Sequence, residues 1–299
     1  MRKVILCVCV ILSTAFKPVS AGESGTANSE ARVENYISSV YNQIDFSKCS
    51  RLSFEAFDKA YHGYLNLLDA GKLNAAKEII SICDFSLSSA ENRLWIIDLA
   101  AKKVLFNTYV AHGQGSGDEF AVSFSNRNES HQSSLGFYVT GDTYDGEHGT
   151  SLRLAGMDPG FNDAAFDRGI VVHGADYVCD KYVCANQRLG RSWGCPAVPA
   201  KLSLPIINTI KDGTCLFIYY PDSRYTKNAY WMNKKATIPQ TALYASILPA
   251  ALTAPKPTRT IVQYMSHGKI DSVKEVHQPT APALPLGRTG IHHPCLNYL

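Results

Sequence analysis

The stretch Gly169-Ile170-Val171-Val172-His173-Gly174 decides the fold that we expect for this chain. A run of β-branched residues bounded by glycines is typical of a short buried strand, and this one ends on a histidine. Comparable runs occur at residues 94–99, 104–110, 135–140, 151–154 and 215–220, and the loops between them are rich in Gly, Asn and Asp. Several short strands of this kind favour a mainly β fold, a mixed β-sandwich or an open barrel, over alternating βα units.

The chain before these strands is predicted to be helical. Apolar residues recur at three- and four-residue steps from Phe54 to Leu68, with Ser53 as a possible N-cap and Gly71 beyond the end. A second, shorter helix is expected at 74–83. We therefore divide the chain into a helical segment (22–88), a β-rich domain (89–221) and an irregular, Pro-containing C-terminal extension (222–299).

Residues 1–21 have the order of a secretory signal peptide. Arg2 and Lys3 precede an apolar stretch at 4–16 that is too short to span a bilayer, and small residues follow at 19–21. This segment carries three basic and no acidic residues, so its removal leaves 26 basic against 26 acidic side chains. The remaining chain lacks the positive surplus of a nucleic-acid-binding protein, and no apolar run is long enough for a membrane span. We expect export to the periplasm or cell envelope.

Seven of the nine cysteines would remain after cleavage, an odd number for an oxidising compartment. Six of them could pair in any of 15 ways. Cys179 and Cys184 form the shortest candidate disulfide, with two unpaired thiols as the alternative. The unpaired cysteine then needs another explanation.

Cys195 is the candidate for the unpaired cysteine, because its thiol could act as a nucleophile. The predicted strand ends on His173, and a loop that contains Gly194 and Cys195 follows 22 residues later, so the fold could bring imidazole and thiol together. An imidazole that takes the thiol proton leaves a thiolate able to attack a carbonyl carbon. The backbone amides of Gly194 and Cys195 could then stabilise the oxyanion. From the residues alone, a buried cysteine beside a structural histidine remains the commoner arrangement.

The motifs around these residues resemble a known family. His173-Gly174 followed by Ser192-Trp193-Gly194-Cys195 is similar to the signature of the L,D-transpeptidase (YkuD-like) family. The segments 111–113, 124–126, 133–138 and 190–197 look like its murein L,D-transpeptidase catalytic domain branch. The likeness runs from about residue 94 to 220 and implies an L,D-transpeptidase-like domain over 89–221.

The resemblance implies roles for individual residues. Cys195 falls on the family's nucleophile, His173 on its general base, and Ser192 on the loop Ser/Thr. The best-known members carry an arginine two residues after the cysteine, where this chain has Ala197, so Arg191 becomes the candidate for binding an anionic substrate group. Trp193, Tyr177 and His112 are further candidate substrate contacts.

The implied reaction is acyl transfer from a peptidoglycan stem tetrapeptide through a Cys195 thioester to an amine, which cross-links two stems, or to water, which trims one. No cofactor and no metal is expected, since thiol and imidazole suffice for this chemistry. Two alternatives remain open: a cysteine peptidase or amidase of the cell wall, and a non-catalytic envelope-binding protein on the same scaffold.

Overall fold

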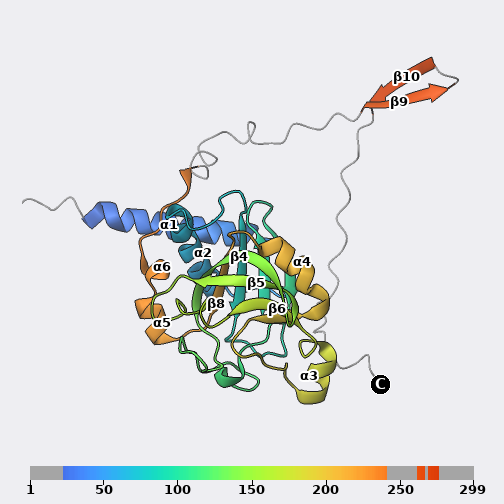
Figure 1. The fold of residues 1–299 in the computed structure, drawn as a ribbon. Coiled ribbons are helices and arrows are strands. Elements are labelled where there is room, and N and C mark those ends of the chain that lie inside the picture. The colour runs from blue at the N-terminus through green and yellow to red at the C-terminus, as the bar shows by residue number, and fades with distance from the viewer. Residues whose placement is uncertain (1–22, 241–260, 267–268, 276–299) are drawn as a thin grey trace, which may run out of the picture.

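The apolar runs of the sequence assemble into one mixed sheet in the computed structural model, which describes residues 23–240, 261–266 and 269–275 (Figure 1). The order of its eight strands is β3-β2-β1-β8-β4-β5-β6-β7. The strands are β1 (Ile79–Asp84), β2 (Leu94–Asp98), β3 (Lys103–Thr108), β4 (Gly136–Gly146), β5 (Gly149–Gly156), β6 (Val171–Ala175), β7 (Ala197–Pro199) and β8 (Cys215–Tyr219). Strands β9 (Ile261–Ser266) and β10 (Lys269–Glu275) form a separate antiparallel pair. The predicted mainly β fold is confirmed.

The sheet curls into a nearly closed barrel. Strands β3 and β7 are its two edges, but the chain that follows β3 crosses to the other edge: Ala111 forms an antiparallel bridge with Ala197, and Gly113 a parallel bridge with Ser192. Two edges that find partners in this way leave fewer unpaired backbone groups. The same bridges place the Ser192–Cys195 loop next to the segment 111–113.

Local sequence signals predict some elements correctly. Strands β2 and β3 form the expected antiparallel hairpin. Helix α2 (Phe54–Asp69) begins at Ser53, whose side chain accepts a hydrogen bond from the Ala56 amide, and Gly71 lies beyond its end at φ +64°. The aromatic stripe of α2 is buried in the core, as its spacing indicates.

The second predicted helix is wrong. Residues 79–84 form β1, which pairs antiparallel with β2 and parallel with β8 near the centre of the sheet. The short run Ile79-Ile80-Ser81-Ile82 is β-branched and apolar, and such a run cannot be assigned to helix or strand by periodicity alone. Strand partners on both sides decide the outcome here.

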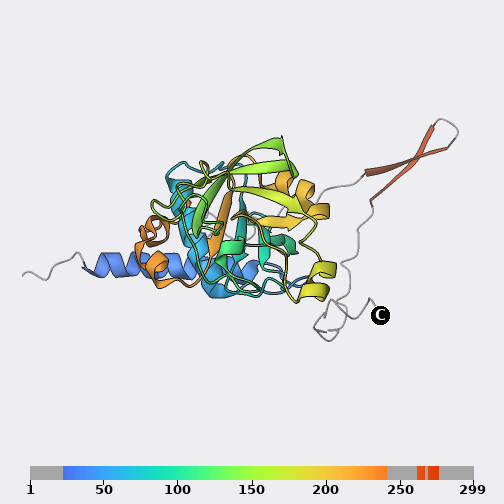
Figure 2. The same cartoon turned by 60° about the horizontal axis from the view of Figure 1, so that its bottom comes forward.

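Helices cover the barrel from two sides. Helix α1 (Glu23–Gln43) packs on α2, and α2 packs on β1 and β8. Helix α4 (Ala200–Ile210) packs on β6, and in both views α4 and α3 (Asp180–Asn186) lie away from the N-terminal part of α1 (Figures 1 and 2). A short 3-10 helix, η1 (Gln114–Ser116), follows the bridge at Gly113.

Part of the predicted C-terminal extension packs onto the barrel. Residues after β8 form α5 (Ser223–Asn228) and α6 (Tyr230–Asn233). Tyr225 is buried and donates a hydrogen bond to Asp158, while Asn66 of α2 donates one to the Trp231 carbonyl oxygen. These buried aromatic side chains make residues 223–233 part of the core. Residues 1–22, with the predicted signal peptide, and most of the remaining extension lie outside the described residues.

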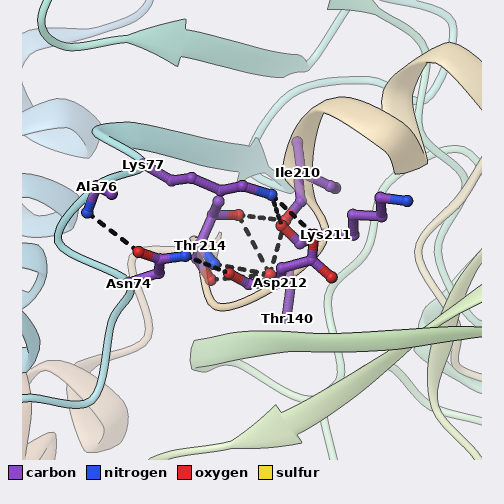
Figure 3. Close-up of polar contacts among 8 residues, drawn as sticks. All are labelled: Asn74, Ala76, Lys77, Thr140, Ile210, Lys211, Asp212 and Thr214. Carbon is purple, nitrogen blue, oxygen red and sulfur yellow. Dashed lines mark hydrogen bonds and ion pairs between the residues drawn. The ribbon is translucent and has the colours of Figure 1, made fainter.

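A polar network fixes the turn between α4 and β8 (Figure 3). Lys77 donates hydrogen bonds to the Lys211 carbonyl oxygen at 2.8 Å and to the Asp212 carboxylate at 2.9 Å. The Thr140 hydroxyl donates to the Ile210 carbonyl oxygen at 2.6 Å. The turn therefore bonds both to the loop before β1 and to β4, which holds β8 between those two strands.

The predicted disulfide between Cys179 and Cys184 does not form, and the described part of the chain contains no disulfide. Cys179 is the N-cap of α3, and its thiol donates to the Asp176 carbonyl oxygen at 3.2 Å. Cys184 lies five residues further on, within α3, and forms no disulfide with Cys179. Among the described residues, no helix is long and apolar enough to cross a membrane.

Candidate active site

Strand β6 carries the predicted base. His173 is buried, and its Nδ1 donates a hydrogen bond to the Gly174 carbonyl oxygen at 3.0 Å. A ring held through Nδ1–H has its second nitrogen, Nε2, as the unprotonated one. His173 lies in parallel register with Ala197 of β7, two residues after Cys195. The imidazole is thus oriented by a backbone contact and kept as a potential base.

The predicted nucleophile lies beside the same strand. The Cys195 sulfur accepts a hydrogen bond from the Val171 amide at 3.5 Å and contacts the Gly169 carbonyl oxygen at 3.7 Å. Val171 precedes His173 by two residues, which is about 7 Å of strand. Cys195 thus lies beside the first residue of β6, and His173 is the middle residue of the same strand. Within the described chain the thiol bonds to these backbone groups rather than to the imidazole.

Ser192 holds the loop that presents Cys195. Its hydroxyl donates to the Cys195 carbonyl oxygen at 2.6 Å and accepts from the Gly194 amide at 3.1 Å. The Gly194 amide, which was expected to help form the oxyanion hole, is thus bonded to Ser192 inside the loop. The Cys195 amide interacts with the Cys195 sulfur itself, so it lies next to the thiol, where the oxyanion of an attacked carbonyl would form.

Gly194 and Gly113 lie back to back, and both positions require glycine. Gly194 has φ +122°, and a Cβ there would lie 2.8 Å from the Gln132 carbonyl oxygen. A Cβ on Gly113 would lie 2.9 Å from the Gly194 Cα. Because the two backbones touch, the Cys195 loop cannot shift without moving the segment at 113.

The pKa shifts favour a neutral Cys195 thiol and a neutral His173 imidazole before a substrate binds. Burial raises the pKa of the Cys195 thiol, while the Val171 amide and the positive charge of Arg168 lower it. Burial also lowers the pKa of His173, and His148, whose ring stacks on it at 4.4 Å, lowers it further. The thiol therefore keeps its proton until the imidazole can accept it, and the imidazole stays neutral and able to accept.

Arg168 and His148 are the residues that sequence reasoning missed as parts of this site. Arg168 lies in the loop before β6, three residues ahead of Val171, and His148 lies at the tip of the β4–β5 hairpin. Their neighbours in the chain carry no recognisable motif. Only the contacts made by folding place a guanidinium near Cys195 and a second imidazole over His173.

Two predicted substrate contacts lie beside the loop. The Trp193 side chain is 71% exposed, and one face of its ring stacks on His131 at 5.1 Å. Tyr177 is half-buried, and burial together with the Cys195 charge raises its pKa to about 12. Both side chains are placed near the nucleophile.

Arg191 and His112, the two other predicted substrate contacts, both bond to other groups of the protein. Arg191 forms an ion pair with Asp118 at 2.7 Å, so its charge is already neutralised. His112 is buried, with Nδ1 2.7 Å from the guanidinium of buried Arg93 and Nε2 3.3 Å from the Gly117 carbonyl oxygen. Both of its ring nitrogens therefore lie within hydrogen-bond distance of other protein groups.

Comparison with known proteins agrees with this architecture. Residues 48–219, more than half of the chain, match the family described as the L,D-transpeptidase catalytic domain. The chain therefore belongs to the L,D-transpeptidase catalytic domain family. No curated protein matches it.

Solved structures with some similarity are also L,D-transpeptidases. The protein from Mycobacterium smegmatis is 10% identical with a TM-score of 0.31, and the match covers 48% of this chain and 59% of that one. The protein from Xylanimonas cellulosilytica is 13% identical with a TM-score of 0.28, covering 63% and 93%. The one from Stackebrandtia nassauensis is 11% identical with a TM-score of 0.30, covering 64% and 92%.

Proposed function

We propose that this protein is a peptidoglycan-modifying acyltransferase that uses Cys195 as nucleophile and His173 as general base. The observation that carries the proposal is that both residues belong to the surroundings of β6: the Cys195 sulfur accepts from the amide of its first residue, Val171, and His173, two residues further on, has its imidazole held through Nδ1. Membership of the L,D-transpeptidase catalytic domain family supports the reaction class.

The first half-reaction forms a thioester. His173 Nε2 takes the thiol proton, and Cys195 Sγ attacks the carbonyl carbon of the diamino-acid residue in a stem tetrapeptide. The Cys195 amide donates to the developing oxyanion. The bond from that carbon to the terminal D-alanine breaks, and the leaving amine receives the proton from His173.

The second half-reaction transfers the acyl group. An amine from a neighbouring stem loses a proton to His173 and attacks the thioester carbonyl carbon, and the sulfur leaves and regains a proton. The product is a cross-link between two stems. Water in place of the amine gives a shortened stem, which is the L,D-carboxypeptidase reaction.

The surroundings of the site suit a peptide substrate attached to sugar. The exposed face of Trp193 offers a flat apolar surface two residues from the nucleophile. We propose that this face contacts the donor stem or its sugar ring, and that the protein works in the periplasm or at the cell envelope.

Incubation of the full protein with purified disaccharide tetrapeptide tests the function. We expect intact-protein mass spectrometry to show an adduct on Cys195 equal to the donor minus D-alanine, and chromatography to show cross-linked dimers. Cys195→Ala should lose both, while Cys179→Ser, a half-buried cysteine on α3, should retain both. Full turnover by Cys195→Ala would refute the proposal.

The products separate the alternatives. A cell-wall peptidase or amidase would yield free peptides without dimers. A non-catalytic envelope-binding protein would bind the muropeptide equally well with and without Cys195 and would show no turnover.

A further inference from the structure

Arg168 anchors the segment 125–134, which lies under the Cys195 loop. Its guanidinium donates four hydrogen bonds to that segment: from Nη1 to the Ser125 carbonyl oxygen at 2.9 Å and to Ser134 Oγ at 2.5 Å, and from Nη2 to Ser130 Oγ at 3.2 Å and to the Gln132 carbonyl oxygen at 2.8 Å. A planar fork with several fixed donors suits such a set of acceptors, and a lysine cannot reproduce it.

The four acceptors of Arg168 are all neutral. No ion pair of the described residues includes Arg168, although its side chain is half-buried. Arg191, the other arginine close to the loop, is neutralised by Asp118. A partly desolvated charge without a counter-ion is costly in a fold. The positive charge of Arg168 therefore remains available to a neighbouring anion.

Two groups near this charge can become anions, the Tyr138 hydroxyl and the Cys195 thiol. Tyr138 is fully buried and burial raises its pKa far above neutral pH, so the thiol is the group that can ionise near neutral pH. Nη2 of Arg168 lies 3.4 Å from the position that a Cβ on Gly194 would occupy, and Gly194 is bonded to Cys195. Arg168 also directly precedes Gly169, whose carbonyl oxygen contacts the sulfur. An anionic sulfur next to that carbonyl oxygen needs a positive charge close by. Arg168 is the cation that lowers the pKa of the thiol, against the larger effect of burial.

We propose that Arg168 is a positioning residue with two roles: it holds the segment 125–134 against Gly194, and it serves as the counter-ion of the Cys195 thiolate. The proposal rests on the proposed function in one respect, that Cys195 must ionise to react. The counter-ion of the thiolate is then Arg168, which lies outside the Cys195 loop, and not Arg191, which pairs with Asp118.

The rate of Cys195 alkylation as a function of pH tests the electrostatic role. The full protein is treated with iodoacetamide, and peptide mass mapping gives the rate at Cys195, with Cys179 in the same digest as reference. We expect Arg168→Met to lower the rate at pH 7 about tenfold and to move the profile to higher pH, whereas Arg168→Lys keeps the wild-type profile. Arg224→Met, which removes an exposed arginine of α5, should change nothing.

A second measurement needs no variant. Iodoacetate is anionic and iodoacetamide is neutral, so a nearby positive charge raises the ratio of their rates. We expect this ratio to be several-fold higher at Cys195 than at Cys179 in the wild-type protein, and to fall in Arg168→Met. Equal ratios at the two cysteines, or an unchanged alkylation profile in folded Arg168→Met, would overturn the proposal.

The positioning role has its own readout. Arg168→Lys retains the charge but not the fork, so we expect muropeptide turnover to fall at least fivefold while the alkylation profile stays unchanged. Turnover at the wild-type level in Arg168→Lys would contradict this role. The outcomes are separable from the proposed function, because the alkylation experiments contain no muropeptide: loss of the acyl adduct from wild-type protein would refute the function and leave the charge effect standing.

Discussion

Replacing Ser192 by alanine removes the hydroxyl that holds the Cys195 loop. Two hydrogen bonds are lost, the 2.6 Å bond to the Cys195 carbonyl oxygen and the 3.1 Å bond from the Gly194 amide. Ser192 is 5% exposed and the Gly194 amide is buried, so water does not replace the missing acceptor without rearrangement. A net hydrogen bond contributes about 1 kcal/mol, and a buried donor left unpaired costs about 1–3 kcal/mol.

We therefore expect Ser192→Ala to lower the free energy of unfolding by about 2–3 kcal/mol. The released loop also shifts the sulfur relative to His173, and a displacement near 1 Å costs up to about 100-fold in rate. Urea unfolding followed by circular dichroism measures the first effect, and turnover of the disaccharide tetrapeptide measures the second.

Two variants make this experiment specific. Ser192→Thr keeps the hydroxyl and should retain most of the stability and rate. Ser39→Ala removes an exposed hydroxyl of α1, which accepts a hydrogen bond from the Gln43 side chain, and should change the unfolding free energy by less than about 0.5 kcal/mol. If Ser192→Ala unfolds and turns over as the wild-type protein does, the loop is not held by this hydroxyl and the reasoning fails.

Three further predictions concern the surroundings of the loop. Burial lowers the pKa of His112 to about 3, so the unfolded chain binds a proton that the folded protein does not. Stability should therefore fall as the pH drops below about 6.5 towards 3, by on the order of 4 kcal/mol, and urea unfolding at several pH values should show a smaller fall in His112→Gln. Gly113→Ala places a Cβ 2.9 Å from the Gly194 Cα and should cost about 2–4 kcal/mol, whereas Gly141→Ala, where the Cβ has 3.5 Å of room, should cost less than 1 kcal/mol by thermal unfolding. Trp193→Ala should raise KM for the muropeptide about tenfold with kcat and the melting temperature nearly unchanged, because the ring is 71% exposed; an unchanged KM would exclude its contact with substrate.

Features that depend on nearby residues were predictable from the sequence. The β2–β3 hairpin follows from two apolar runs joined by a polar turn, and α2 follows from its apolar spacing and the cap at Ser53. The apolar strand that contains His173 and the loop at Gly194 and Cys195 are likewise local signals, although β6 ends at Ala175 and not at His173. How close His173 lies to the Cys195 loop depends on the register of β6 and β7, which the sequence pattern alone does not specify.

Consecutive residues carry the strand patterns, the helix cap and the Gly-Cys loop, so the mainly β class, the candidate nucleophile and base, and the family resemblance could be inferred without a structure. Which positive charges near Cys195 lack a negative partner depends on the tertiary structure. Asp118 forms an ion pair with Arg191, and the Arg93 guanidinium bonds to His112 Nδ1. Arg168 bonds only to neutral acceptors, which lie 34–43 residues away in the sequence, so its positive charge is not cancelled by them. A side chain's partners are set by packing between distant segments, and no local periodicity records them.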